Sequence, residues 1–233
     1  MHKTIGILGG LSPESTVAYY SYIIRKYTER FGDYSYPEII IYSVNFQRYI
    51  AWGQSGQWKH IAEDMIRAAR SLERAGADFG VIATNTMHIV FDQVQAGVKI
   101  PFLHLIDATA EAIKTRTLSK VGLLGTRFTM SESFYKGRLA ANSITAIVPD
   151  APEQEEIDRV IYEELVRGRI VEASRKRFME IIAELGERGA EGIILGCTEI
   201  PMLVSEKNCS LPLFDTTTIH AEKALQYSVS GRT

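Results

Sequence analysis

Ile5-Gly6-Ile7-Leu8-Gly9-Gly10 is the stretch of sequence that decides the fold. It is an apolar run that ends in two glycines, and a similar stretch, Val121-Gly122-Leu123-Leu124-Gly125-Thr126, follows 116 residues later. An apolar run that ends in glycine is typical of a buried parallel strand that turns tightly into a helix. One such stretch is common in α/β proteins, but its return further along the chain raises the question of a duplication.

Two further pairs of segments repeat in the same order and at nearly the same offset. Gly76-Ala77-Asp78 returns as Gly189-Ala190-Glu191 after 113 residues, and Ile100-Pro101-Phe102 returns as Leu211-Pro212-Leu213 after 111 residues. The alternative is that such short motifs are common beside the strands of any α/β protein. Because the three pairs keep both the same order and nearly the same offset, we interpret the chain as two related halves. The first half is expected at residues 1–103 plus 210–233 and the second at residues 104–209.

Segments of strand length and helix length alternate along the whole chain. Amphipathic periodicity predicts helices over residues 57–75, 154–167 and 173–188. Runs rich in Ile, Val and Leu predict strands at residues 4–8, 38–44, 80–83, 102–105, 120–124, 144–148, 192–195 and 212–214. The expected class is α/β, with two pseudo-symmetric Rossmann-like domains of mostly parallel strands. The active site is expected in the cleft between them, beyond the carboxyl ends of the strands.

Composition excludes several classes of protein. The 233 residues are 45% hydrophobic and 23% charged, as in globular domains. The 26 Lys and Arg against 28 Asp and Glu give a net charge of -2, without the basic excess typical of nucleic-acid binding. Neither a signal peptide nor an apolar run of membrane-spanning length is recognisable. We therefore expect a cytoplasmic protein with reduced cysteines and with no nucleic-acid or membrane partner.

Thr84 and Cys197 occupy matching positions in the two halves. The repeat aligns Ala83-Thr84-Asn85-Thr86 with Gly196-Cys197-Thr198-Glu199, each at the end of an apolar strand. A pseudo-twofold relation would place the hydroxyl and the thiol on opposite walls of one cleft. A helix starting after Cys197 is expected to lower the pKa of its thiol, with an inert buried cysteine as the alternative. The Thr84 hydroxyl is expected to donate or relay a proton, or else to cap a helix.

The remaining polar residues carry weaker signals. The loop at residues 9–16 opens a helix and offers N–H groups to an anion, but it is neither a dinucleotide fingerprint nor a Walker loop. Cys209, in a polar turn without a counterpart, is expected to be a bystander. His88, one turn beyond Thr84, is expected to be a structural histidine, with a supporting partner of Thr84 as the alternative. No metal is expected, because no useful ligand spacing occurs among the five histidines, His2, His60, His88, His104 and His220.

Taken together, these residues resemble the aspartate/glutamate racemase family, the cofactor-independent amino-acid racemases. The resemblance covers essentially the whole chain, through residues 5–12, 84–88, 196–200 and 214–216. It is strongest with the bacterial L-aspartate/L-glutamate-specific members, in which Thr stands at the first catalytic position. It implies that the chain interconverts L- and D-aspartate or glutamate, with no cofactor, as a homodimer. Thr84 and Cys197 would be the catalytic pair.

The resemblance also implies a mechanism and a set of binding residues. Most members carry cysteine at both catalytic positions, so Thr84 is a departure that puts a symmetric, reversible reaction in doubt. Arg48 is an alternative to Gln47 for the side-chain carboxylate of the substrate, and Arg167 or Arg169 replaces a basic residue of other members. The implied substrate-binding residues are Leu11, Gln47, Asn85, Thr86, Thr126, Thr198 and Glu199.

Two alternatives keep the fold and change the function. A related cysteine-dependent isomerase, decarboxylase or other lyase would use the single thiol to protonate an enolate or to attack a double bond. A weakly active protein that binds dicarboxylates would use the same cleft without turnover. The three possibilities differ in whether the α-proton exchanges and in whether the mass of the substrate changes.

Overall fold

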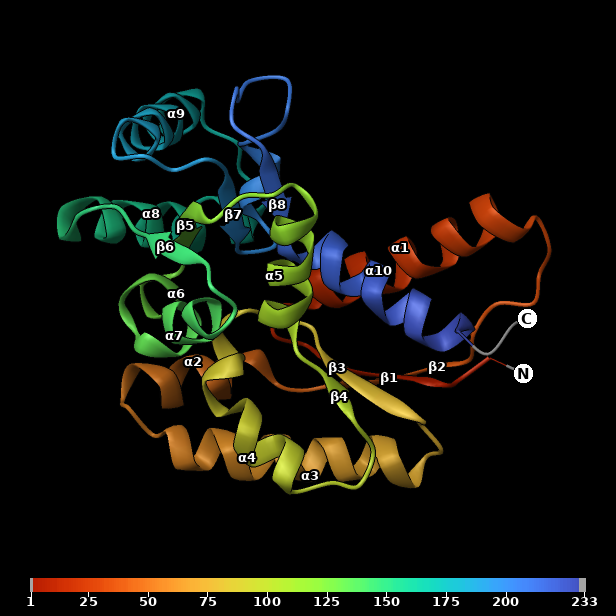
Figure 1. The fold of residues 1–233 in the computed structure, drawn as a ribbon. Coiled ribbons are helices and arrows are strands. Elements are labelled where there is room, and N and C mark those ends of the chain that lie inside the picture. Colours follow the sequence, from red (N-terminus) through yellow and green to blue (C-terminus); the bar gives the residue numbers. More distant parts are fainter. Residues whose placement is uncertain (1, 231–233) are drawn as a thin grey trace. The chain divides into compact units, whose positions relative to one another are not determined.

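The computed structural model describes residues 2–230, and its chain divides into two compact units (Figure 1). Unit 1 comprises the described residues up to Leu105 and those from Thr217 onward, and unit 2 comprises Ile106–Thr216. The sequence places the return to the first half after residue 209, whereas the chain returns after Thr216. The reason is that β8 (Leu213–Asp215) pairs with β7 (Ile193–Gly196) in the sheet of unit 2.

The sheet of unit 1 is parallel throughout. Its strand order is β2-β1-β3-β4, with bounds β1 (Ile5–Gly9), β2 (Ile39–Ser43), β3 (Phe79–Ile82) and β4 (Phe102–Leu103). The central strands β1 and β3 are buried along their whole length, which explains their unbroken apolar sequences. In this register Leu8 lies opposite Ile82, so the segments that follow β1 and β3 leave the same edge side by side.

Helices cover both faces of this sheet (Figure 1). On one face, α1 (Pro13–Phe31) and α10 (Thr216–Val229) pack on β1 and β3 through Tyr19, Ile23 and Leu225. On the other face, α3 (Trp58–Arg74) and α4 (Phe91–Ala96) pack through a second apolar cluster. The shorter α2 (Phe46–Gln54) follows β2, and the 3-10 helix η1 (Thr86–Val90) follows β3.

Unit 2 repeats this topology. Its parallel order is β6-β5-β7-β8, with β5 (Lys120–Gly125) and β6 (Thr145–Ile147) joining β7 and β8. The first-half strands β1, β2, β3 and β4 therefore correspond in order and position to β5, β6, β7 and β8. All eight predicted strands and the α/β class with two Rossmann-like units are confirmed. The duplicated motifs fall on equivalent strands.

The helices of unit 2 surround its sheet. Two of them, α8 and α9, pack on β5 and β7 through an apolar cluster that includes Ile157, Phe178 and Ile193. A capping box begins α8: the Asp150 side chain accepts from the backbone N–H of Glu153, and the Glu153 side chain accepts from the backbone N–H of Asp150. The bounds are α5 (Leu105–Thr115), α6 (Arg127–Ser131), α7 (Ser133–Ala141), α8 (Ala151–Glu163), η2 (Leu165–Arg167), α9 (Glu172–Glu187) and η3 (Ile200–Met202).

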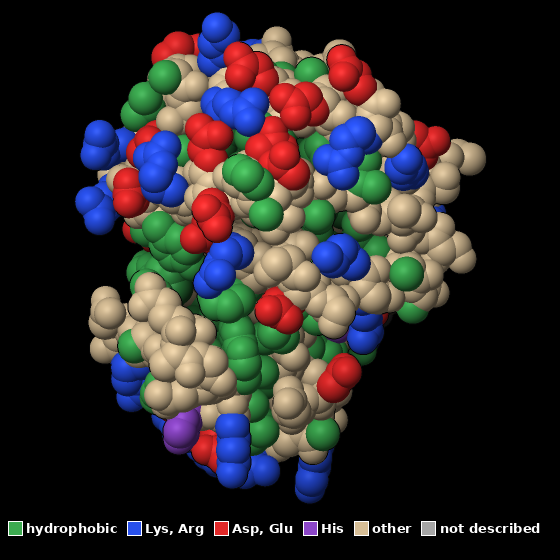
Figure 2. All heavy atoms as spheres, turned by 90° about the vertical axis from the view of Figure 1, so that its left-hand side faces the viewer, with side chains coloured by type: hydrophobic (Ala, Val, Ile, Leu, Met, Phe, Trp, Pro, Cys, Tyr) green, Lys and Arg blue, Asp and Glu red, His purple; other side chains and the backbone are tan. Residues whose placement is uncertain are grey.

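Charged side chains of both signs are interspersed over the upper part of the face in Figure 2. Arg177 of α9 illustrates the pattern, because its guanidinium pairs with Glu153 at 2.8 Å and with Glu156 at 3.1 Å. These pairs are typical of solvated helix faces. Within residues 2–230, no helix has the length and apolar character needed to cross a bilayer.

Candidate active site

Thr84 follows β3 at the carboxyl edge of the sheet in unit 1, with a partly exposed side chain. Three hydrogen bonds fix the backbone there. The Ser15 hydroxyl donates to the carbonyl of Ala83 at 2.8 Å, and the Thr84 N–H donates to the carbonyl of Ile82 at 2.9 Å. The carbonyl of Thr84 accepts from Nδ1 of His88 at 2.8 Å. The strand end that carries the hydroxyl is therefore held from two sides.

The loop after β1 borders this strand end and is shaped by close backbone approach. Gly10 has a φ of +84°, and a Cβ atom there would lie 2.5 Å from the backbone of Val44. Thr16 closes the loop, because its hydroxyl accepts from the N–H of Gly10 at 2.8 Å and donates to the carbonyl of Ser12 at 3.1 Å. Leu11 is buried in the core of unit 1. The first motif is thus a tight turn packed against the end of β2.

Cys197 follows β7 directly, at the equivalent edge of unit 2. Its side chain is partly exposed, and Sγ donates to Oε2 of Glu199 at 3.0 Å. Glu199 itself is buried, with 7% of its surface exposed. Burial and the carboxylate of Glu199 raise the pKa of the Cys197 thiol well above its usual value, and Asp158 adds to this effect. Cys197 is therefore a thiol that donates to a carboxylate at neutral pH.

The direction of this pKa shift is opposite to the sequence expectation. The chain after Cys197 forms only the single 3-10 turn η3, and Pro201 lies within it. No α-helix starts there, so this segment of the described chain lacks the helix dipole that would favour a thiolate. The backbone N–H of Glu199 lowers the pKa of the thiol, but burial and the carboxylate of Glu199 outweigh it. The carboxylate two residues later disfavours the thiolate.

Two residues of α8 join the surroundings of Cys197 and were missed in the sequence. Asp158 raises the pKa of the Cys197 thiol, and its own pKa is raised by burial. Burial, followed by the charges of Asp158 and Cys197, raises the pKa of the Tyr162 hydroxyl. Asp158 accepts from the backbone N–H of Arg127 at 2.7 Å, which ties α8 to the start of α6. Their i,i+4 spacing on one helix face was the available signal.

The other predicted site residues fall into two groups, one in each unit. In unit 2, Thr126 follows β5 beside Cys197, because Gly125 pairs with Gly196, and the Thr126 hydroxyl caps α6 by accepting from the N–H of Thr129 at 3.4 Å. Thr198 is partly exposed between Cys197 and Glu199. In unit 1, Asn85 is buried beside Thr84, and Thr86 begins η1.

The arginine and glutamine residues predicted for the site are further away along the chain from the ends of β3 and β7. Gln47 is exposed in the first turn of α2. The guanidinium of Arg48 pairs with Asp64 at 2.8 Å and lies over the ring of Trp52, so this cation already has a carboxylate partner. Arg167 and Arg169 are exposed around the end of η2.

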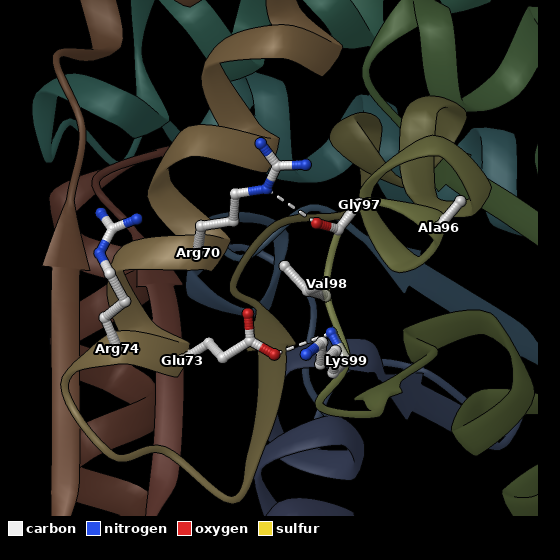
Figure 3. Close-up of a pocket in the computed structure, with 7 residues that line it drawn as sticks. All are labelled: Arg70, Glu73, Arg74, Ala96, Gly97, Val98 and Lys99. Atoms are coloured by element: carbon white, nitrogen blue, oxygen red, sulfur yellow. Dashed lines mark hydrogen bonds between the residues drawn. The ribbon is translucent and has the colours of Figure 1, made fainter.

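A surface hollow in unit 1 lies apart from these residues in the sequence. Figure 3 shows it between the carboxyl end of α3 and the loop after α4, with Arg70, Glu73 and Lys99 among its lining residues. Nε of Arg70 donates to the carbonyl of Gly97 at 2.9 Å, and the N–H of Lys99 donates to Glu73 at 2.8 Å. These bonds fasten the loop to the helix, so we assign the lining a structural role.

Metal ligands do not gather in the part of the chain that the structure describes. Among residues 2–230, no three His, Cys, Asp or Glu side chains form a group that would hold a metal ion. Cys209 is partly exposed, and its thiol donates to the carbonyl of Leu211 at 3.5 Å.

Fold and site together define an α/β protein with two like-ordered parallel sheets, a hydroxyl after the third strand of one and a thiol–carboxylate pair after the third strand of the other. Residues 8–224 match the family described as Asp/Glu/Hydantoin racemase. The chain belongs to this family of racemases.

Individual relatives align over nearly the whole chain. A candidate Asp/Glu racemase from Yersinia pestis is 44% identical, with 97% of this chain and 99% of that chain covered and a TM-score of 0.92. An aspartate racemase homologue from Pyrococcus horikoshii is 41% identical, with 98% and 99% covered and a TM-score of 0.86. The broad specificity amino-acid racemase RacX from Bacillus subtilis is 24% identical, with 95% of this chain and 96% of the relative covered.

Proposed function

We propose that this protein is a cofactor-independent racemase of aspartate or glutamate, with Cys197 as the principal base and Thr84 as the opposing proton donor. The observation that carries the proposal is the contact of Cys197 Sγ with Glu199 Oε2 at 3.0 Å, at a strand end equivalent to that of Thr84. Family membership and the Asp and Glu racemases among the relatives support the reaction and the substrate class.

In the proposed reaction, the substrate itself activates the thiol. Burial and the carboxylates of Glu199 and Asp158 favour the protonated form of Cys197. An α-ammonium group bound beside Glu199 would offset the negative charge and lower the pKa of the thiol, as a nearby opposite charge does. The thiol proton would pass through Glu199 to solvent, and the thiolate would take the α-proton, leaving a carbanion whose charge spreads onto the α-carboxylate.

The second proton transfer would come from Thr84. Its hydroxyl would deliver a proton to the opposite face of the α-carbon and regain one from solvent. A hydroxyl is a far weaker acid than a thiol, so the reverse direction, in which Thr84 takes the α-proton, would be slow. We therefore propose a racemase that exchanges the α-proton of one enantiomer much faster than that of the other, with the substrate bound by Leu11, Gln47, Asn85, Thr86, Thr126, Thr198 and Glu199.

The test is a proton NMR assay in deuterium oxide with both enantiomers of aspartate and glutamate. The wild type should remove the α-proton signal from at least one enantiomer, and Cys197→Ala should abolish this exchange. Cys209→Ala is the matched control, because it removes the other cysteine of the chain and should leave exchange unchanged. Undiminished exchange in Cys197→Ala would overturn the proposal.

The same samples separate the proposal from the two alternative functions. Racemisation conserves the mass of the substrate apart from one deuterium, whereas a decarboxylase or other lyase changes it. Tight binding of a dicarboxylate without any exchange at high enzyme concentration would indicate a binding protein. A cytoplasmic location and a homodimer stay part of the proposal, and light scattering of the purified protein measures the oligomeric state.

A further inference from the structure

His88 is a buried imidazole in unit 1 whose two ring nitrogens both contact the backbone. Nε2 lies 3.2 Å from the N–H of Leu105, which donates to it, so Nε2 is the unprotonated nitrogen. Nδ1 then carries the proton, and it lies 2.8 Å from the carbonyl of Thr84. One neutral imidazole thus links the start of α5 to the residue that carries the proposed proton donor.

The ring of His88 is held in place by its neighbours. It is 4% exposed and stacks on Phe91, with ring centroids 5.5 Å apart and planes 8° apart. His104 and His220 lie against it, with ring centroids at 4.7 Å and 6.0 Å. Because the ring is packed on several sides, its nitrogens keep fixed positions. The hydrogen bond from Nδ1 can therefore hold the Thr84 carbonyl in a fixed position.

The equivalent position of the second half has no imidazole to hold the strand end. The offset of 113 residues that aligns Thr84 with Cys197 aligns His88 with Pro201, which has no imidazole. There, Glu199 contacts the reacting atom itself. The imidazole is therefore a feature of the threonine half alone, and it contacts the backbone of Thr84 and leaves the hydroxyl to other groups.

We propose that His88 is a positioning residue for Thr84: its Nδ1–H holds the Thr84 carbonyl and so fixes the direction of the hydroxyl for proton delivery. The proposal rests on the proposed function, since it gives Thr84 the role of donor. A displacement of about 1 Å costs a proton transfer on the order of 10²-fold in rate. The effect should fall on the step that uses Thr84 and spare the step that uses Cys197.

Two substitutions separate the contacts of the ring. His88→Asn places an amide N–H where Nδ1 lies and keeps a donor for Thr84, whereas His88→Gln places an amide oxygen where Nε2 lies and keeps an acceptor for Leu105. Each variant loses ring packing, so a purely structural role predicts similar losses in both. The positioning role predicts that only His88→Gln loses the alignment of Thr84.

The experiment follows inversion and exchange together in deuterium oxide. With the enantiomer whose α-proton Cys197 removes, His88→Gln should racemise about 10- to 100-fold more slowly than the wild type while exchange with retention changes less than about twofold. His88→Asn should keep racemisation within about threefold. Equal losses of inversion and exchange, or equal losses in the two variants, would overturn the proposal.

A measurement without substrate keeps the two proposals apart. The ¹³C signal of the Thr84 carbonyl should shift in His88→Gln and stay near its wild-type position in His88→Asn, because only the first variant loses the donor. An unchanged Thr84 carbonyl in His88→Gln would overturn the positioning role. Absence of exchange by the wild type with every aspartate and glutamate enantiomer would instead overturn the proposed function.

Discussion

Cys197 shows how the surroundings of one residue decide its chemistry. Its strand-end position is that of a reactive cysteine, yet its thiol lies beside the carboxylate of Glu199 and near that of Asp158. Thiolate nucleophiles in proteins usually lie near cations or helix N-termini. The arrangement here favours the protonated thiol, and in the proposed function the α-ammonium group of the substrate would be the cation that reverses this preference.

The raised pKa of the Cys197 thiol predicts slow alkylation at neutral pH. In a Cys209→Ala background, the rate of reaction with iodoacetamide should keep rising with pH through pH 9, because the thiolate fraction is still growing there. Glu199→Gln removes one negative charge and should lower the thiol pKa, so that alkylation at pH 8 becomes faster than in the Glu199-containing protein. A rate that levels off below pH 8 in the Glu199-containing protein would contradict the shift.

Thr84→Cys tests the other position. A thiol is a much better proton acceptor and donor near neutral pH than a hydroxyl, so the variant should remove the α-proton from the poorer enantiomer at least about tenfold faster than the wild type does. The ratio of the initial rates from the two enantiomers measures this change. Thr84→Ser is the matched control, because it keeps a hydroxyl and should keep the bias. An unchanged ratio in Thr84→Cys would remove Thr84 from the reaction.

At the scale of single elements, α10 secures unit 1 through one buried histidine. Nε2 of His220 lies 3.0 Å from the carbonyl of Leu103 at the end of β4, to which it donates, and Nδ1 lies 2.8 Å from the hydroxyl of Tyr19 in α1, from which it accepts. Burial lowers the pKa of His220 to about 3. The imidazole is therefore neutral in the folded protein.

This histidine predicts a loss of stability on acidification. Between about pH 6.5 and pH 3, the unfolded chain binds a proton at His220 that the folded protein does not, so the free energy of unfolding falls as the pH falls. The expected contribution is about 2 kcal/mol between pH 7 and pH 5. Urea unfolding at both pH values, in the wild type and in His220→Gln, measures it. An equal pH dependence in the variant would contradict the assignment.

The elements also show what the sequence can and cannot predict. Apolar runs and repeats in the sequence predict the strands of both sheets. Strands such as β5 and β7 are buried on both faces, so their sequences are almost entirely apolar. The helix expected after Cys197 is a single 3-10 turn, Ile200–Met202. Asp158 stands among other acidic residues in the sequence, and only the fold brings it toward Cys197 and partly buries it.

The hydrogen bonds of His88 near Thr84 could be predicted only in part from the sequence. The i,i+4 spacing of His88 allowed a link to Thr84, but the sequence says nothing of the second bond, from the N–H of Leu105. That bond fixes which nitrogen carries the proton. Site residues followed from the duplication and the family resemblance, whereas their protonation states depend on distances that only coordinates give.

At the scale of the whole molecule, the two units differ in how the chain builds them. Unit 2 is one continuous segment, Ile106–Thr216, and contains the full sheet β6-β5-β7-β8 with its own apolar cluster. Unit 1 is interrupted, and its core includes Ala221 and Leu225 from α10, which the chain supplies only after unit 2.

A fragment of residues 105–216 should therefore fold by itself. It contains every strand of its sheet and the helices that cover it, so no core residue of its apolar cluster is left behind. Dispersed amide signals in an NMR spectrum and a cooperative thermal transition are expected. The matched fragment of residues 1–105 lacks α10 and should give neither. A collapsed fragment of residues 105–216 without a cooperative transition would contradict this independence.

The late position of α10 has a consequence for synthesis on the ribosome. The chain emerges from its amino end at a few residues per second, so the inserted unit is complete while the sheet of the earlier one still lacks a helix on one face. Until residue 225 has left the exit tunnel, the apolar surface of β1 and β3 on that side is open to chaperones. A premature stop shortly after residue 216 would then leave unit 2, which contains Cys197, able to fold. Unit 1, although translated first, would lack α10 and would not fold.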